Sequence, residues 1–219
     1  MIIQHVIKGI NGIDDAMARH LLDSGIKCLW WVNNDPLPFH EVPLRLNERN
    51  LDWHQNQYKQ PDPLYPDAAN PNNEPFHLHT PFVSATAGTV DRDAYQQTNT
   101  LTPAWEVALK FATDFWKSDG YLFYCYVFVI GKPAVGQQSF SEELRELNVY
   151  PGYSNFQPEG EITAKIVIPP AQIERAEFWS SQDAKTARDN KKLPAASRTL
   201  YGKHYVAPQD FNNVRDFLK

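Results

Sequence analysis

Two short sequence patterns place side chains that can perform chemistry on one face of an extended segment. The first is Glu159-Gly160-Glu161-Ile162. Alternate side chains of a strand point to the same face, so Glu159 and Glu161 would share one. Two carboxylates at that spacing repel each other unless hydroxyl groups or a cation compensate. Most Glu-x-Glu pairs are solvated strand edges, but a pair at the mouth of an otherwise apolar strand favours a functional site.

The second pattern is Phe82-Val83-Ser84-Ala85-Thr86. On a strand, Ser84 and Thr86 would point to one face, while Val83 and Ala85 would point to the other. A Ser-x-Thr pair alone is common and is usually part of a solvated strand. The functional interpretation depends on both patterns occurring in one chain, with a helical segment between them.

Other common catalytic patterns do not occur. The sequence has neither of the standard Gly-rich phosphate-binding loops and no Gly-x-Ser-x-Gly elbow. His77 and His79 would alternate on one face, but no third metal ligand stands nearby, which favours ordinary loop histidines. The remaining histidines are scattered and carry no catalytic signal: His5, His20, His40, His54 and His204.

The composition is that of a globular chain of one domain or one domain with an extension. The 219 residues are 42% hydrophobic and 21% charged, which excludes disorder over the whole length. The formal net charge of -5 excludes a polycation for nucleic acid, although residues 177–219 hold 8 basic and 5 acidic residues. Cys28 and Cys125 are too few for a disulfide framework and are expected to be buried thiols. No signal peptide or membrane-length apolar run is visible, so a cytoplasmic protein without membrane association is expected, with export without a signal left open.

The first half of the chain predicts a helix, a strand and a long loop. An acidic start and a glycine stop indicate a short helix over Asp14–Gly25. The apolar run Ile26–Asn33 is expected to be a strand. Six prolines between Lys59 and Pro81 exclude a regular helix or a central strand there, so this segment is expected to be a surface loop. The segment Phe82–Thr86 is expected to be a short strand.

The second half adds a helix and two strands, which together indicate an α+β fold. Thr102-Pro103 is expected to open a helix. The uncharged run Tyr121–Ile130 is expected to be a central strand, and Ile162–Ile168 a further strand. Residues 180–204 are polar and basic. The helix after Pro103 has an apolar stripe that is expected to face the core: Ala104, Val107, Ala108, Phe111, Ala112 and Phe115.

Taken in chain order, the Ser-x-Thr pattern, the helical segment and the Glu-x-Glu pattern resemble the mono-ADP-ribosyltransferase family of the cholera-toxin type. In that family a strand carries a Ser-Thr-Ser element, a helix follows, and a Glu-x-Glu stands on a later strand. Residues 82–86 resemble the first element, residues 105–115 the helix, and residues 159–162 the second element. Ile168-Pro169-Pro170-Ala171-Gln172-Ile173 and Trp179 are also similar to a segment found in family members.

The resemblance implies NAD as cosubstrate and two small β-sheets packed around an NAD cleft. By its place in the motif, Glu161 would contact the ribose 2′-hydroxyl and stabilise an oxocarbenium-like ribose. Glu159 would orient or deprotonate the incoming nucleophile. Ser84 would hydrogen-bond Glu161, and Thr86 would support the same wall of the cleft.

The third motif of the family, an arginine on the first strand, has no direct counterpart. The corresponding segment is Leu29-Trp30-Trp31-Val32, and Trp31 stands at the position of the arginine. Three explanations stay open. NAD stacks on Trp30 or Trp31, catalysis has been lost, or another basic residue supplies the charge. The candidates for that residue are Arg45, Arg49 and Arg92.

The acceptor is expected to be read by the loop Tyr150–Gln157, since the corresponding loop of the family contacts the acceptor. Tyr153, Phe156 and Gln157 are the candidate contacts, and the alternative is that the two aromatic side chains only pin the loop to the core. In the family, two glutamates at this spacing often accompany arginine modification, so the resemblance implies a protein arginine as acceptor. A carboxylate at Glu159 can also pair with a guanidinium. The basic C-terminal segment makes an RNA or DNA base the second choice.

The resemblance therefore predicts an NAD-dependent mono-ADP-ribosyltransferase acting on a macromolecule, in the role of a toxin or effector. An antitoxin or immunity protein is a candidate partner. The alternatives are a non-catalytic NAD-binding or protein-binding module and an NAD glycohydrolase. Residues 26–179 are expected to form the transferase-like domain, residues 1–25 an N-terminal helical extension, and residues 180–219 a basic C-terminal extension packed on the same domain.

Overall fold

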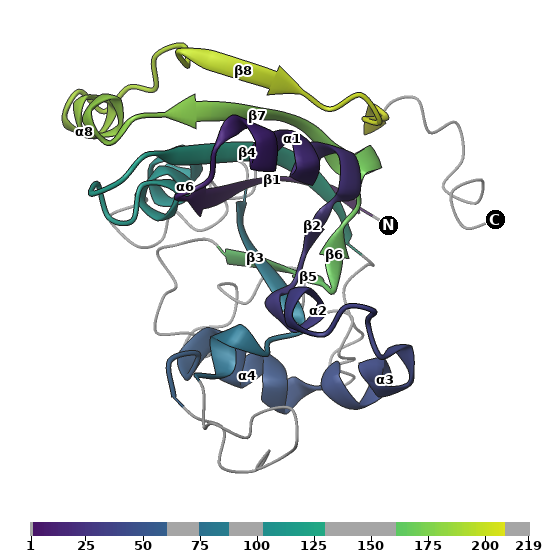
Figure 1. The fold of residues 1–219 in the computed structure, drawn as a ribbon. Helices are drawn as coiled ribbons and strands as arrows, with labels where there is room; N and C mark the ends of the chain where they lie inside the picture. Colours follow the sequence, from purple (N-terminus) through teal and green to yellow (C-terminus); the bar gives the residue numbers. More distant parts are fainter. Residues whose placement is uncertain (1, 61–74, 88–102, 130–160, 209–219) are drawn as a thin grey trace.

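The computed structural model describes residues 2–60, 75–87, 103–129 and 161–208. These residues form a mixed α+β fold with a six-stranded antiparallel sheet and a two-stranded sheet (Figure 1). The predicted α+β class is confirmed at this level. None of the helices in these ranges is long and apolar enough to span a membrane.

The large sheet has the strand order β5-β3-β1-β4-β7-β8. The small sheet pairs β2 with β6. The strands of the large sheet are β1 (Ile2–Asn11), β3 (Phe82–Ala87), β4 (Gly120–Val129), β5 (Glu161–Lys165), β7 (Ile173–Trp179) and β8 (Arg198–Tyr201). Those of the small sheet are β2 (Ile26–Lys27) and β6 (Val167–Ile168).

The N-terminal residues belong to the centre of the large sheet. Residues 1–25 were expected to be a helical extension, but residues 2–11 form β1, which lies between β3 and β4. Its pairing with β4 runs from Ile2 opposite Val129 to Asn11 opposite Gly120. Gly9 lets helix α6 (Ala104–Ala112) lie directly on this strand, because a Cβ at Gly9 would collide with the backbone of Ala108. The strand therefore also carries the helix that covers one face of the sheet.

Helix α1 (Asp15–Ser24) confirms the prediction from its end signals. The side chain of Asp14 accepts a hydrogen bond from the Met17 N–H at 2.8 Å, as a helix N-cap does. Gly25 ends the helix with a φ of 86°, a conformation that favours glycine.

The predicted strand over Ile26–Asn33 is wrong after Lys27. Only the first two residues pair in a sheet, and helix α2 (Leu29–Asn33) follows. Cys28 takes the N-cap position, and its Sγ accepts the Trp31 N–H at 3.4 Å. Short apolar runs do not separate strand from buried helix by pattern, which is why this segment was misassigned.

Helix α6 (Ala104–Ala112) is confirmed, with two changes. Pro103 precedes the helix as its N-cap residue, and Thr102 lies outside the described residues. Five α6 residues are buried: Ala104, Val107, Ala108, Leu109 and Ala112. Phe111 and Phe115, which were expected to face the core, are 40% and 48% exposed. The helix ends at Ala112, so Phe115 no longer follows the helical stripe.

The central strand predicted over Tyr121–Ile130 is confirmed as β4, which begins at Gly120 and is described as far as Val129, with Ile130 outside the described residues. The strand predicted over Ile162–Ile168 is divided, because Ile166 has a left-handed φ of 63°. Residues before this point form β5 in the large sheet, and residues after it form β6 in the small sheet. The polar segment 180–204 forms helix α8 (Ser181–Asp189) and strand β8.

Three short helices lie together beyond the β3–β5 end of the sheet (Figure 1). These are α2, α3 (Val42–Arg45) and α4 (Glu48–Asn56). From the predicted proline-rich loop, the described residues 75–81 include a 3-10 turn, Phe76–Leu78, which packs against α2 and α4. This group of helices faces the strands that carry the two sequence patterns.

The two faces of the large sheet bury different cores. One core contains Val83 and Ala85 of β3 and Ile162 of β5, together with Trp30 of α2. The other lies under α6 and α8 and includes Leu122 of β4. Because side chains alternate along a strand, the residues adjacent in sequence to Val83 and Ala85 on β3, and to Ile162 on β5, point away from the first core.

Candidate functional site

The hydroxyl and carboxylate residues of the two sequence patterns lie on one face of paired strands. In the β3–β5 register, Ser84 is opposite Thr163 and Thr86 is opposite Glu161. All four point away from the core that contains Val83, Ala85 and Ile162. The Thr163 hydroxyl donates to Glu161 Oε1 at 3.4 Å. The register thus places Glu161 beside the Ser-x-Thr pair. The hydrogen-bond partner of Ser84 is His54, whereas the resemblance implies Glu161.

His54 of α4 connects Ser84 with Glu161. Its Nε2 lies 2.7 Å from Ser84 Oγ and 3.5 Å from Glu161 Oε1. Its Nδ1 lies 2.8 Å from Thr80 Oγ1. The imidazole and the carboxylate are only 8% and 15% exposed, so this ion pair, formed when His54 is protonated, is largely shielded from water.

Local structure fixes the position of the His54 ring. The Asn47 side chain caps α4 by accepting the Asn50 N–H at 2.8 Å. The His54 ring packs 5.5 Å from the ring of Phe82, the first residue of β3. Thr80, which holds Nδ1, also accepts the Phe82 N–H at 3.3 Å. Thr80 and Phe82 thus orient the His54 ring at the start of β3, the strand that carries its partner Ser84.

Glu161 also affects the pKa of a second basic side chain, Lys8 of β1. Burial lowers the pKa of the Lys8 ammonium group from its usual value, and the negative charge of Glu161 partly opposes this lowering. Lys8 belongs to β1, the strand next to β3. The carboxylate thus interacts with a histidine and, at longer range, with a lysine of the neighbouring strand.

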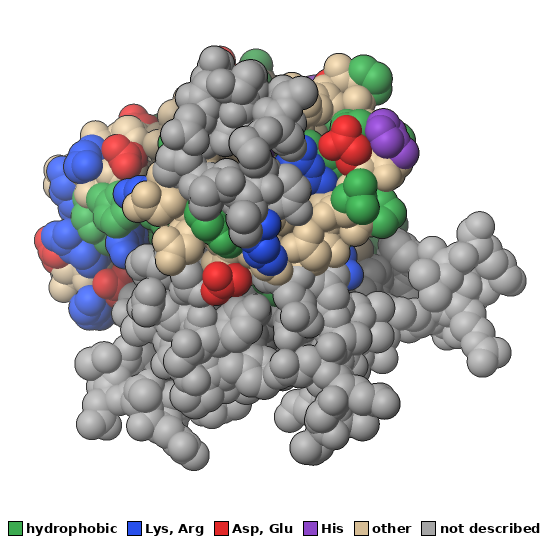
Figure 2. Space-filling model, turned by 90° about the horizontal axis from the view of Figure 1, so that it is seen from below, with side chains coloured by type: hydrophobic (Ala, Val, Ile, Leu, Met, Phe, Trp, Pro, Cys, Tyr) green, Lys and Arg blue, Asp and Glu red, His purple; other side chains and the backbone are tan. Residues whose placement is uncertain are grey.

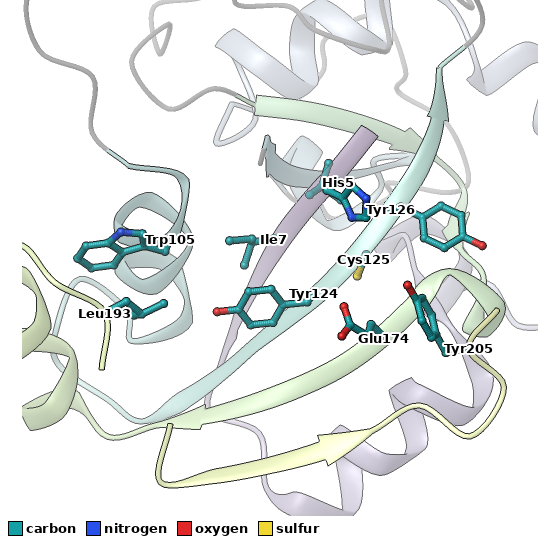
Figure 3. Close-up of a pocket in the computed structure, with 10 residues that line it drawn as sticks. His5, Ile7, Trp105, Tyr124, Cys125, Tyr126, Glu174, Leu193 and Tyr205 are labelled. Carbon is teal, nitrogen blue, oxygen red and sulfur yellow. The ribbon is translucent and has the colours of Figure 1, made fainter. Parts of the chain in front are cut away.

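The same face of the sheet carries a pocket of about 270 Å³ (Figure 3). Trp105 and Leu193 lie at one end, Tyr124 lies in the middle, and His5 and Tyr126 lie at the other end. Ile7 also lines the pocket and is the direct register partner of Thr86. The pocket is therefore separated from Glu161 by a single strand, β3. Its aromatic lining suits a planar ring.

Trp31 does not belong to this group of side chains. It lies on helix α2 and not on a strand, and it packs against the core on the opposite face of β3 and β5. Its ring contacts Phe39 at 6.4 Å between centroids and the Lys27 ammonium group at 4.5 Å. Residues 29–32 therefore do not form a strand, whereas the resemblance implies that Trp31 lies on one.

The other predicted residues are placed in part. Arg45, a candidate for the missing arginine, is buried, lies 5.3 Å from the Trp30 ring and pairs with Glu41 at 3.6 Å. Five further predicted residues lie outside the described residues: Arg92, Tyr153, Phe156, Gln157 and Glu159.

The residue that sequence reasoning missed is His54. Its partners are 26, 30 and 107 positions away, so no local motif could indicate them. The only sequence signal is a histidine in a short helix that precedes the proline-rich segment, and that signal does not distinguish His54 from the other histidines.

No protein-family model matches the sequence, and no curated protein matches it either. The features of this chain that bear on function are the arrangement of Ser84, His54 and Glu161 and the pocket on the same face of the sheet.

Proposed function

We propose that this protein is an NAD-dependent ADP-ribosyltransferase in which Glu161 is the catalytic carboxylate. One observation carries the proposal: Ser84 and Glu161, which come from two separate sequence patterns, contact the same nitrogen of His54. A hydroxyl and a carboxylate fixed side by side can recognise the vicinal hydroxyl groups of a ribose. The proposed fold is the ADP-ribosyltransferase fold. The α+β class supports it, whereas the six-stranded sheet differs from the two small sheets that the resemblance implies.

The reaction requires a carboxylate more than it requires an acid. The bond between the ribose C1′ and the nicotinamide nitrogen breaks, and nicotinamide leaves as a neutral molecule without protonation. Positive charge develops on the ribose, and the Glu161 carboxylate stabilises this charge more strongly than it stabilises NAD itself. The acceptor then bonds to C1′ and loses a proton, so the products are ADP-ribosylated acceptor, nicotinamide and one proton.

We assign a positioning role to His54. Thr80 holds the imidazole at Nδ1, which leaves Nε2 directed at Ser84 and Glu161. A carboxylate held before the reaction needs no reorganisation when charge develops on the ribose.

The pocket lined by Tyr124 and Trp105 is the proposed site for a ring of NAD. It lies on the same face as Glu161 and contains His5 as a basic side chain. Aromatic walls favour a nicotinamide or adenine ring over a flexible aliphatic group. The role of Trp31 as a stacking partner is not supported by its position on α2.

The acceptor remains a proposal from sequence. A protein arginine is the first choice and an RNA or DNA base the second, and both depend on Glu159 and on residues 150–157, outside the described ranges. A toxin or effector role, an antitoxin partner and a cytoplasmic location are likewise proposals.

The decisive experiment measures free nicotinamide after incubation with NAD, with and without cell extract. We expect release by the unchanged protein and a loss of about 10²–10³-fold in Glu161→Gln, which removes one charge and almost no volume. The matched control is Glu106→Gln, because the Glu106 side chain is similarly buried and pairs with Lys191 at 3.0 Å. This control should retain activity.

Three outcomes would contradict the proposal. No release by the unchanged protein in either condition would favour a non-catalytic module. Release without any labelled macromolecule would favour an NAD glycohydrolase. Near-normal turnover by Glu161→Gln would remove Glu161 from the mechanism.

A further inference from the structure

The last turn of α6 and the turn that follows it each expose one phenylalanine, and charged side chains surround both. Phe111 and Phe115 are 40% and 48% exposed. Their rings meet edge to face with centroids 5.9 Å apart. Isolated exposed apolar residues need no explanation, but two aromatic rings in contact form a patch.

The backbone after α6 is held in a conformation that keeps this patch in place. Asp114, Phe115 and Trp116 all have left-handed φ values, 41°, 56° and 71°. Non-glycine residues adopt this region at a cost, so three in succession need compensating contacts. The buried Thr113 provides them, because its hydroxyl donates to the Leu109 carbonyl and accepts the Trp116 N–H. The turn is thus an ordered structure that presents Phe115 to solvent.

Basic side chains surround these rings. The Lys110 ammonium group lies 4.9 Å from the Phe115 centroid and 5.5 Å from the Phe111 centroid. The Lys117 ammonium group lies 5.9 Å from Phe115. On α8, which packs against α6, the guanidinium of Arg188 lies 5.1 Å from the Trp116 ring. Basic and aromatic side chains therefore alternate across two neighbouring elements.

The acidic neighbours reduce this positive charge without cancelling it. Asp114 lies 4.0 Å from Lys117, and Asp189 lies 2.8 Å from Arg188. Lys185 and Lys192 of the α8 region add further positive charge. Figure 2 shows Lys and Arg side chains gathered around hydrophobic ones at the left edge, the side on which Figure 1 places α6 and α8. In a chain of net charge -5, this face is suited to an anionic partner.

We propose that this aromatic–basic surface, formed by Lys110, Phe111, Phe115, Trp116, Lys117 and Arg188, binds single-stranded nucleic acid. Unpaired bases stack on exposed aromatic rings, and lysine and arginine neutralise the phosphates between them. The bases of a duplex are already stacked, so a duplex would use only the charges. An anionic lipid surface fits less well, because burying the rings in hydrocarbon would also desolvate Asp114 beside them. The proposal is independent of the transfer reaction at Glu161.

The test is fluorescence anisotropy with a labelled oligothymidine of about 20 nucleotides, chosen to exceed the usual site sizes. We expect Phe115→Ala to weaken binding on the order of tenfold, while Phe115→Tyr retains most of it. The charge variant Lys110→Gln should weaken binding and reduce the dependence on salt concentration by roughly one phosphate contact. The matched control is Phe39→Ala, because Phe39 is 72% exposed and lies near α3, away from this surface.

Each comparison can overturn the proposal. Equal affinity of the Phe115→Ala and Phe39→Ala variants for the oligothymidine would exclude stacking on Phe115. If Phe115→Ala unfolds the turn, Lys110→Gln still tests the surface, and an unchanged affinity of that variant would overturn the proposal. Equal affinity for a duplex of the same length would exclude single-strand recognition. If the variants weaken sedimentation with phosphatidylserine vesicles and leave oligonucleotide binding unchanged, the partner is a membrane and the proposal fails.

Discussion

Energetic coupling between His54 and Glu161 is the most direct measure of whether these residues form one site. We consider the variants His54→Leu and Glu161→Gln and the double variant that combines them. Both substitutions nearly preserve side-chain volume, so the coupling energy reports on the contact between imidazole and carboxylate and much less on cavities.

The expected magnitude follows from the burial and geometry of the pair. Nε2 lies 3.5 Å from Glu161 Oε1, and both side chains are largely shielded from water. When His54 is protonated, removing one member of a fully buried ion pair costs about 3–5 kcal/mol, and the remaining exposure of Glu161 reduces this to about 2–3 kcal/mol for His54→Leu. Part of that cost comes from the hydroxyls of Ser84 and Thr80, which also lose their partner. We therefore expect a coupling of about 1.5–2 kcal/mol in the double variant.

The assay is urea denaturation of the four proteins, with the free energy of unfolding extrapolated to water. A matched control exists in the chain, because His40 and Glu41 form a similar pair at 3.8 Å that is 83% and 36% exposed. The same cycle at that pair should give no measurable coupling. Equal coupling in the two cycles would show that shielding does not strengthen the His54–Glu161 contact, and the argument for a preorganised carboxylate would fail.

Two further predictions concern packing and thiol chemistry. Gly120→Ala would place a Cβ against the Ala112 carbonyl and should lower the free energy of unfolding in urea denaturation by about 3 kcal/mol or more. The control Gly12→Ala has open space and a φ of 67°, and should lower it by about 1 kcal/mol. Equal losses would refute the close packing of α6 on β4. Burial raises the pKa of the Cys28 thiol to about 11, so alkylation at pH 8 should be about 100-fold slower than for a free thiol and should become fast in denaturant. Because the folded state holds this proton more tightly, the associated stability is present below about pH 9 and is lost as the pH rises toward 11. Rapid alkylation of the folded protein at pH 8 would contradict that environment.

Elements with strong end signals or long uniform patterns could be predicted from the sequence. Asp14 and Gly25 define α1, and the uncharged run after Gly120 defines β4. The strand β1 was missed because polar residues and Gly9 interrupt its alternation, so its place between β3 and β4 depends on pairing with distant residues. Ile166 could not be identified as a break, because β-branched residues rarely adopt a left-handed φ and the sequence gives no sign of it.

The candidate site was predicted in part for a related reason. Local alternation is sufficient to place Ser84 and Thr86 on one face, and the β3–β5 register then brings Glu161 beside them. His54 comes from a helix whose position depends on the turn at Phe76 and on Thr80, and neither contact has a sequence signature. Phe115 was assigned to the core because the helical stripe was extended beyond Ala112, where α6 ends. Phe111 was assigned to the core because the buried face of α6 includes Leu109, which the predicted stripe left out.

The central position of β1 has a consequence for synthesis on the ribosome. This strand leaves the ribosome before both of its neighbours, since β3 begins at Phe82 and β4 ends at Val129. At roughly 5–20 residues per second, β1 waits on the order of ten seconds before its main partner is complete. During that time both edges of this ten-residue strand are open to other nascent chains. The large sheet can form only after β3 and β4 have been synthesised and have paired with β1. Folding is therefore expected to be slow and sensitive to chaperone supply.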